Sequence, residues 1–470
     1  MVLQLLKEQK ARKRLTLRKH NEFTCSSFYL TFTPLFINLD LTRIKRQPYA
    51  AQSPTTPKSK LEALQCHFTW DLDRSRSKPF CLRDSIEDIG TEEGNSWLGH
   101  IYNLQGFIQY KLGFTEDAQS LFNKAAEAFS QTRGAAEGPW LVVNYGNLAW
   151  LHHHLGDQAE SQAYLSKVDA LMEKYPSPSQ DELHPEIYAE KAWTLMKFST
   201  DKRLLAADYF QRAIRMQPDM VEWNTSQILA LVTAANHNKE EELGADVFEK
   251  MRIAKKQDPE NLYLAALYLE QRAKRGERVE DEARELSRKV LRNPVSSYSG
   301  LTPLLRLYRV HISMTEAVKL VEEALKEHPG ARYLKWCAAN CYKWKVQDSA
   351  DSIEVERAIS LCKEVIELYP DSSFKIKIGL AGIYGKWNRQ KEAHETYEEL
   401  LQRKDLDAAE TEQLSRKSRR FFKNLEQDHH RPIQHQTEVK AETPQQSVNQ
   451  PIGSFVGGAS ESWKRLISEK

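Results

Sequence analysis

Five prolines recur along the chain at nearly equal intervals, and this period limits the possible folds more than any other feature. The intervals are 41, 35, 35 and 41 residues, and the prolines are Pro218, Pro259, Pro294, Pro329 and Pro370. Each closes a stretch with helical spacing of apolar residues, because proline cannot continue a helix. No alternation typical of strands competes with this pattern. A period in the thirties indicates a solenoid, so we predict an all-α fold of stacked helical units.

The spacing inside each unit is similar to that of a tetratricopeptide repeat, in which two antiparallel helices pack together. The first unit contains Tyr102, Gly106, Gly113, Ala118, Phe122 and Ala125. We expect the small residues Gly106 and Ala118 to lie where the two helices touch, and Phe122 to fill the gap between units. The prediction is a superhelical solenoid of about eight helix pairs.

Charge is distributed unevenly along the chain. Residues 1–60 carry 12 Lys and Arg against 3 Asp and Glu, and the whole chain carries 67 against 65, so residues 61–470 sum to −7. A net charge of +2 produces no overall positive potential that would attract nucleic acid. Any anion-binding site in the main body must therefore be a local pocket. The basic stretch from Lys7 to Lys19 also loosely resembles a transit peptide.

We divide the chain into four parts. The predicted parts are a basic extension at 1–55 (disordered or an artefact of gene prediction), a helical cap at 56–95, the solenoid at 96–405 and a polar, partly disordered tail at 406–470. The longest apolar stretch, Ser27 to Leu39, has 13 residues and is too short to span a bilayer. We therefore expect no membrane span.

Cysteines and histidines are placed where neither disulfides nor metal binding is expected. Six cysteines in 470 residues make no disulfide framework, so we predict buried thiols in a reducing compartment. Successive residues on a helix turn by about 100°, so His152, His153 and His154 cannot converge on one ion. No nucleotide-binding loop or catalytic signature occurs, and we predict no enzyme and no cofactor.

Several motifs together point to one family, and the first and fourth of those given next are specific to it. They are Cys66-His67-Phe68-Thr69-Trp70-Asp71-Leu72, Asp84-Ser85-Ile86, Tyr102-Asn103-Leu104, Tyr145-Gly146-Asn147-Leu148-Ala149-Trp150 and His154-Leu155-Gly156. This series resembles the interferon-induced proteins with tetratricopeptide repeats over about residues 60–400. The resemblance implies a cytosolic antiviral effector that is induced by interferon. Some members of that family hold the 5′ end of foreign RNA in a positively charged tunnel, whereas others act through complexes with their relatives.

Lys197 is the most informative position for ligand binding. It stands nine residues before Ala206, where other units place Tyr308 and Tyr384. An inward lysine beside Trp193 is costly unless it meets an anion. The resemblance implies that Lys197 reaches the 5′ phosphates. The alternative is that Lys197 runs along Trp193 to solvent or pairs with a carboxylate, Glu190.

Four further residues complete the predicted site. The resemblance implies a phosphate contact for Ser85, although a serine at a helix start is also typical of an N-cap. We predict that Trp193, His153 and Arg306 line the cavity. Arg309 and Lys343 are further basic residues that could line the same cavity.

At several positions the sequence departs from the residues found in the relatives that bind triphosphates. Thr233 replaces an arginine, Ile89 a glutamine, Ser96 a lysine, and Thr302-Pro303 an Arg-Tyr pair. A hydroxyl cannot supply the charge or the bidentate geometry of a guanidinium. These departures favour a second hypothesis, a protein-interaction adaptor without affinity for RNA ends.

The predicted partners follow from the two hypotheses. They are single-stranded RNA with a 5′-triphosphate or an unmethylated cap, and other family members or host proteins, with no membrane and no DNA. Asn147 resembles the asparagine of a carboxylate clamp in chaperone-binding repeats. That clamp also needs Lys and Asn in the preceding unit, where Asn103 and Phe107 stand, so we exclude a co-chaperone.

Overall fold

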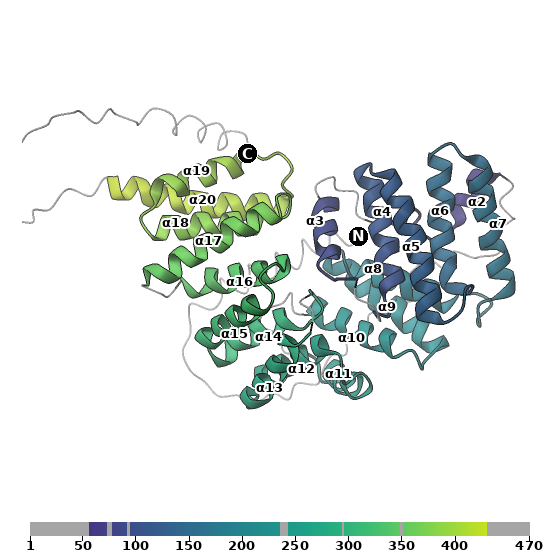
Figure 1. Cartoon of the computed structure of the whole chain (residues 1–470), viewed down its shortest axis with the longest axis horizontal. Helices are drawn as coiled ribbons and strands as arrows, with labels where there is room; N and C mark the ends of the chain where they lie inside the picture. The colour runs from purple at the N-terminus through teal and green to yellow at the C-terminus, as the bar shows by residue number, and fades with distance from the viewer. Residues whose placement is uncertain are drawn as a thin grey trace, which may run out of the picture. The chain divides into compact units, whose positions relative to one another are not determined.

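The computed structural model describes residues 56–72, 78–91, 95–235, 243–293, 296–347 and 351–429. Within these residues every regular element is helical, and successive helices lie side by side in chain order (Figure 1). The predicted extension at 1–55, the end of the predicted tail at 430–470 and Pro294 lie outside the described residues.

Two short helices precede the repeats, and eight helix pairs follow in the described part of the chain. The first two are α2 (Pro57–Ala63) and α3 (Lys78–Glu87). The pairs are α4 (Leu98–Leu112) with α5 (Thr115–Arg133), α6 (Val142–His154) with α7 (Gln158–Lys174), α8 (Pro185–Leu195) with α9 (Thr200–Met216), α10 (Val221–Ala235) with α11 (Ala245–Gln257), α12 (Leu262–Lys274) with α13 (Glu280–Leu291), α14 (Leu301–Leu307) with α15 (Met314–Glu327), α16 (Arg332–Lys345) with α17 (Ser352–Leu368), and α18 (Phe374–Lys386) with α19 (Gln390–Leu401). Two single turns, η2 (Pro139–Leu141) and η3 (Tyr308–Ile312), and a last helix, α20 (Ala408–His429), complete the described elements. The predicted all-α repeat solenoid is confirmed.

The contact inside the first pair confirms the predicted repeat frame. A Cβ atom added to Gly106 in α4 would lie 2.7 Å from the ring of Phe122 and 3.1 Å from the carbonyl oxygen of Ala118 in α5. Phe122 and Ala118 are fully buried. A side chain at position 106 would therefore force the two helices apart.

The closing prolines also have the predicted role. Pro218, Pro259, Pro329 and Pro370 each come directly after the C-cap residue of α9, α11, α15 and α17, respectively. The ring of proline disfavours helical backbone at the preceding residue, so each helix ends there.

The residues before α3 pack on the second pair. Cys66 is buried, and a Cβ atom on Gly146 of α6 would lie 3.0 Å from its Cβ. The rings of Phe68 and Trp150 stack at 6.2 Å between centroids, and the indole N–H of Trp150 donates to the Leu61 carbonyl at 3.0 Å. Two motifs about 80 residues apart in the sequence thus form one packed unit.

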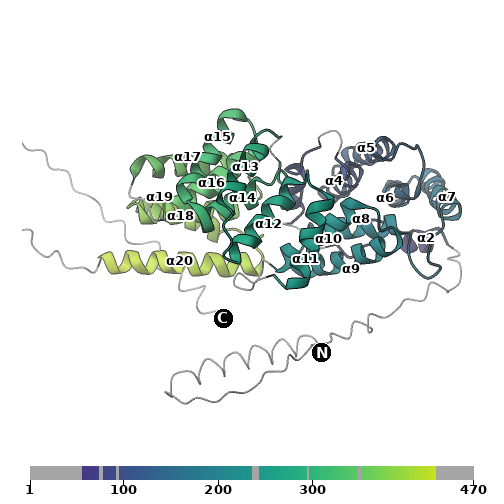
Figure 2. The ribbon, with the colours of Figure 1, turned by 90° about the horizontal axis from the view of Figure 1, so that it is seen from below.

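The helix α20 lies inside the segment that we predicted as a polar tail. It contacts α18 and α19 (Figure 2), and its Leu414 is buried in a cluster with Phe374, Tyr397 and Leu400. Phe421 packs 5.2 Å from Tyr397 between ring centroids. The tail between residues 408 and 429 is therefore a docked helix, because Leu414 and Phe421 lie on one face and present apolar side chains to the last pair.

Four of the five cysteines in the described residues are buried, and none forms a disulfide. Cys81 on the short helix α3 is exposed, which corrects the prediction of buried thiols at that position. No described helix is both long and apolar enough to cross a bilayer.

Candidate functional site

Lys197 follows directly after the C-cap residue of α8, and its side chain ends between two aromatic rings. Its Nζ atom lies 4.1 Å from the centroid of the Trp193 ring and 4.7 Å from that of Tyr298. The ammonium also donates a hydrogen bond to the Tyr298 hydroxyl. Lys197 is half-buried, whereas Tyr308 and Tyr384 at the equivalent positions of later units are 3% and 4% exposed.

Among the residues that the structure describes, the charge of Lys197 has no acidic partner. Burial, followed by the nearby guanidinium of Arg203, lowers the pKa of Lys197 to about 7. No carboxylate of the described residues lies within ion-pair distance of its Nζ. The alternative of a pair with Glu190 is wrong, because Glu190 accepts a hydrogen bond of 2.8 Å from Asn103. An anion at this position would supply the missing counter-charge.

Aromatic residues continue from Tyr298 to the next pairs. The rings of Tyr298 and Tyr263 lie 5.4 Å apart, and Tyr263 belongs to α12. Burial raises the pKa of Tyr263 to about 12, with Tyr298 adding to the rise and Arg306 and Arg203 opposing it. Cations and aromatic rings are thus interleaved, which is an arrangement suited to phosphates and bases.

Sequence reasoning missed Tyr298, Tyr263 and Arg203. Tyr298 lies in the connection between α13 and α14, 101 residues after Lys197, and no local spacing indicates their contact. Arg203 lies six positions after Lys197, and a basic residue at that distance was the one available signal.

Arg306 does not offer a free guanidinium. Its Nε donates to Oε1 of Glu270 at 2.7 Å, and its Nη2 donates to Oε2 of the same carboxylate. Glu270 is 3% exposed. The buried carboxylate thus already neutralises Arg306, and its place in the cavity lining stays a prediction.

Ser85 is the eighth residue of α3 and is exposed, so the N-cap alternative is wrong. Its neighbours Asp84 and Glu87 carry negative charge on the same helix. The structure shows no contact between Ser85 and Lys197, and the phosphate contact of Ser85 stays a prediction.

His153 lies at the end of α6, away from the contacts of Lys197. Its ring packs edge-on against Trp150 at 5.8 Å, and its Nδ1 lies 3.3 Å from Nε2 of Gln158. None of these contacts joins His153 to Lys197, and its place in the cavity lining stays a prediction. Among the residues that the structure describes, no group of three His, Cys, Asp or Glu side chains is placed to hold a metal ion.

None of the substituted side chains supplies a positive charge for an anion. The Thr233 hydroxyl donates to the Leu229 carbonyl at 2.7 Å, and the Thr302 hydroxyl is hydrogen-bonded to the Tyr333 hydroxyl. Ile89 is buried in the apolar core, and Ser96 is exposed. Neither threonine hydroxyl is left free for a phosphate.

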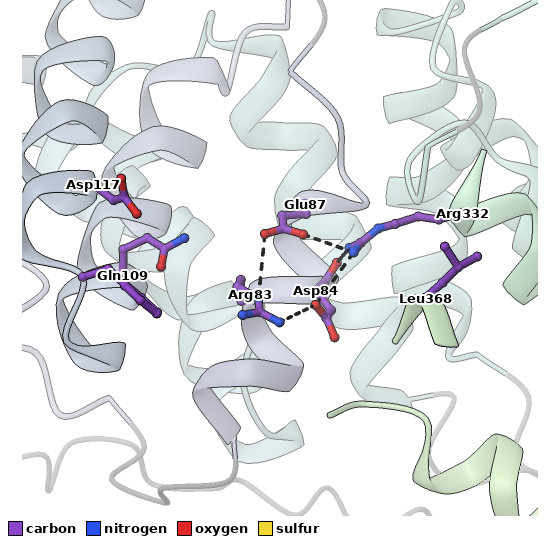
Figure 3. Close-up of a pocket in the computed structure, with 8 residues that line it drawn as sticks. Arg83, Asp84, Glu87, Gln109, Asp117, Arg332 and Leu368 are labelled. Carbon is purple, nitrogen blue, oxygen red and sulfur yellow. Dashed lines mark hydrogen bonds and ion pairs between the residues drawn. The ribbon is translucent and has the colours of Figure 1, made fainter. Parts of the chain in front are cut away.

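A separate cleft of 310 Å³ lies between α3 and α16 (Figure 3). Arg332 pairs with Glu87 at 3.1 Å, and Arg83 pairs with Asp84 at 3.3 Å. Three carboxylates and two guanidinium groups line the cleft, with Asp117 as the third carboxylate. Because its arginines are already paired, the cleft is unsuited to an anionic ligand.

The fold and the repeat contacts define an all-α tetratricopeptide-repeat protein. The tetratricopeptide repeat family matches residues 97–174. The chain is also similar to interferon-induced protein with tetratricopeptide repeats 2 from Homo sapiens, with 26% identity over 61% of this chain and 60% of that protein. It is 24% identical to antiviral innate immune response effector IFIT1 from Homo sapiens over 73% of this chain and 75% of that protein. The predicted resemblance to the interferon-induced proteins with tetratricopeptide repeats is confirmed.

Solved structures agree on the fold. A human IFIT1 dimer with PPP-AAAA has a TM-score of 0.61 at 24% identity and covers 79% of this chain and 82% of that chain. A monomeric mutant of IFIT1 with Gppp-AAAA has a TM-score of 0.64 at 23% identity, with coverage of 79% and 84%. The match to the first relative above spans less than two thirds of its length.

Proposed function

We propose that this chain is a non-catalytic antiviral effector that binds the 5′ end of single-stranded RNA, with Lys197 contacting the 5′ phosphates. The observation that carries the proposal is the half-buried Lys197 ammonium, which lies between Trp193 and Tyr298 and has no acidic partner in the described part of the chain. A phosphate would replace the lost solvation of this cation. The relatives solved with PPP-AAAA and Gppp-AAAA support this ligand class.

Burial of the phosphate site would also provide specificity. Trp193 is 3% exposed and stacks on Trp97 at 5.8 Å, so it forms a fixed wall, whereas Tyr298 is 37% exposed and offers an open ring face. A base next to the phosphates can stack on such a face. A narrow site would exclude a methylated cap by steric clash. We place this activity in the cytosol and assign it no enzymatic step.

The test is a binding assay with one RNA sequence that carries a 5′-triphosphate, an unmethylated cap or a 5′-hydroxyl group, at stated salt concentrations. Replacing Lys197→Ala is expected to weaken triphosphate binding about tenfold or more, because a charge-assisted contact contributes about 1.5–3 kcal/mol. Binding of the 5′-hydroxyl RNA is expected to stay nearly unchanged.

The matched control is Lys191→Ala. Lys191 lies on α8, which ends just before Lys197, and its Nζ also lies near two rings, those of Trp70 at 5.8 Å and Tyr209 at 5.0 Å. This variant removes a comparable cation from a different place, and we expect it to leave 5′-end preference intact. An equal loss in both variants would contradict a specific role for Lys197.

The paired state of Arg306 favours a second candidate function, an adaptor that acts through protein partners. Glu270 cancels the charge of Arg306, and Thr233 supplies none, so the site has fewer free cations than the sequence allows. The adaptor hypothesis predicts wild-type protein that does not distinguish 5′-triphosphate from 5′-hydroxyl RNA.

A further inference from the structure

The exposed surface of α20 carries five cations for which the described side chains offer no acidic partner. They are Arg416, Lys417, Arg419, Arg420 and Lys423, and all five side chains are exposed. No acidic residue occurs between Glu412 and Glu426. No carboxylate whose side chain the structure describes, which on α20 means up to residue 425, lies within ion-pair distance of any of the five. We call this group the α20 basic stripe.

Many arginines elsewhere on the surface have carboxylate partners, although Arg288 on α13 has none among the described residues. Examples with their distances are Arg212–Asp208 at 3.0 Å, Arg284–Asp281 at 3.2 Å and Arg389–Glu392 at 2.8 Å. The α20 basic stripe therefore differs from an ordinary solvated face, in which charges of both signs are mixed. The stripe places five positive charges on one helix, although residues 61–470 together carry a net charge of −7.

Packing fixes the direction in which the stripe points. Leu414, Ser418 and Phe421 lie toward α18 and α19, and Ser418 has no exposed surface. Arg416 precedes Ser418 by two positions and Arg420 follows it by two. Both therefore lie about 200° around the helix from Ser418. Arg416 and Arg420 thus face away from the solenoid, whereas Lys417 and Arg419, one position from Ser418, lie about 100° to either side of it.

We propose that the α20 basic stripe is a second RNA-binding surface, which contacts the phosphodiester backbone downstream of the 5′ end. Arg416, Arg420 and Lys423 follow one another at helical spacing and span about 10 Å, enough for two or three phosphates of one strand. Arginine binds phosphate oxygens in a bidentate manner. An RNA strand is repelled by the negative body of the protein and attracted to this stripe. The choice of RNA as the polyanion rests on the proposed function.

The test compares two 5′-triphosphate RNAs of about 4 and about 30 nucleotides, because the short one fills only the 5′-end site. In the full-length protein, Arg416→Gln, Arg420→Gln and Lys423→Gln are combined, since glutamine keeps helix propensity and removes charge. We expect about tenfold weaker binding of the long RNA, and a slope of log K against log salt that is smaller by about 2. Binding of the short RNA is expected to stay unchanged.

The matched control removes three exposed lysines from other helices, as Lys124→Gln, Lys250→Gln and Lys256→Gln. It changes the net charge by the same amount and is expected to leave both RNAs unaffected. An equal loss in the control, or no loss with the long RNA, would overturn the proposal. So would a stripe variant that keeps RNA binding but loses binding to vesicles of anionic lipid.

A long 5′-hydroxyl RNA separates this proposal from the proposed function. The stripe contacts no 5′ end, so the triple variant is expected to weaken this RNA as well. If wild-type protein ignores the 5′ phosphates and the triple variant still loses long RNA, the 5′-end proposal fails and the stripe stands. If the 5′ preference is present and the triple variant binds long RNA normally, the stripe proposal fails alone.

Discussion

The backbone N–H of His67 donates a hydrogen bond of 3.1 Å to Oδ1 of Asn147, and Nδ2 of Asn147 lies 3.1 Å from Nδ1 of the same histidine. The other ring nitrogen of His67 lies 3.1 Å from the Thr194 hydroxyl. Both His67 and Asn147 have no exposed surface. One amide group thus joins the residues before α3 to the second helix pair, and a carboxylate clamp at Asn147 is excluded because its side chain is already occupied.

We expect Asn147→Ala to destabilise the protein by about 1–3 kcal/mol, because the His67 amide and ring nitrogen lose their partner in a buried site. Urea unfolding with a constant m-value would measure the change. Asn123, exposed on α5, is the control, and Asn123→Ala is expected to change stability by less than about 0.5 kcal/mol. Equal effects at both positions would mean that the buried contact contributes nothing.

We expect Gly106→Ala to destabilise the protein by about 1–3 kcal/mol, because the added methyl group would meet the Phe122 ring at 2.7 Å. Gly382 in α18 has open space where its Cβ would lie, and Gly382→Ala is expected to stabilise by about 0.5–1 kcal/mol through helix propensity. Opposite signs in thermal unfolding support the repeat frame. A stabilising Gly106→Ala would contradict it.

We expect Glu190→Gln to stabilise the protein at neutral pH. Burial raises the pKa of Glu190 to about 8, with Asn103 opposing the rise. The folded state therefore holds a proton that the unfolded state releases above its pKa near 4.5, so the carboxyl costs stability as pH rises from there to about 8. The gain from the variant is expected to be roughly 1–3 kcal/mol at pH 7 and to vanish near pH 4. A gain that is independent of pH would refute the titration of Glu190.

We expect binding of 5′-triphosphate RNA to weaken as pH rises above 7. The pKa of Lys197 is lowered to about 7 in the free protein, and a bound phosphate raises it, so binding takes up a proton. Between pH 7.5 and 9, affinity is expected to fall by up to about tenfold for each pH unit. In Lys197→Arg the side chain stays charged, and the pH dependence is expected to disappear. An unchanged slope in this variant would place the titrating group elsewhere.

Much of the fold follows from the sequence because its contacts are local. Gly106 and Phe122 meet within one helix pair, and Pro218, Pro259, Pro329 and Pro370 act on the helix just before each of them. Because the same spacing pattern recurs along the chain, counting its copies also predicts the number of helix pairs. The sequence analysis did not predict α20, because most of its residues are polar and only a few, such as Leu414 and Phe421, form its apolar face.

The candidate site likewise contains residues that the sequence predicts and contacts that only the tertiary structure shows. Sequence alone singled out Lys197 and its neighbour Trp193, because both belong to one helix end and one repeat frame. Only the tertiary structure placed Tyr298 on Lys197, paired Arg306 with Glu270 and joined His67 to Asn147. These pairs are 101, 36 and 80 residues apart. Whether a cation is free or neutralised depends on which distant carboxylate folds beside it, and no spacing along the chain encodes that.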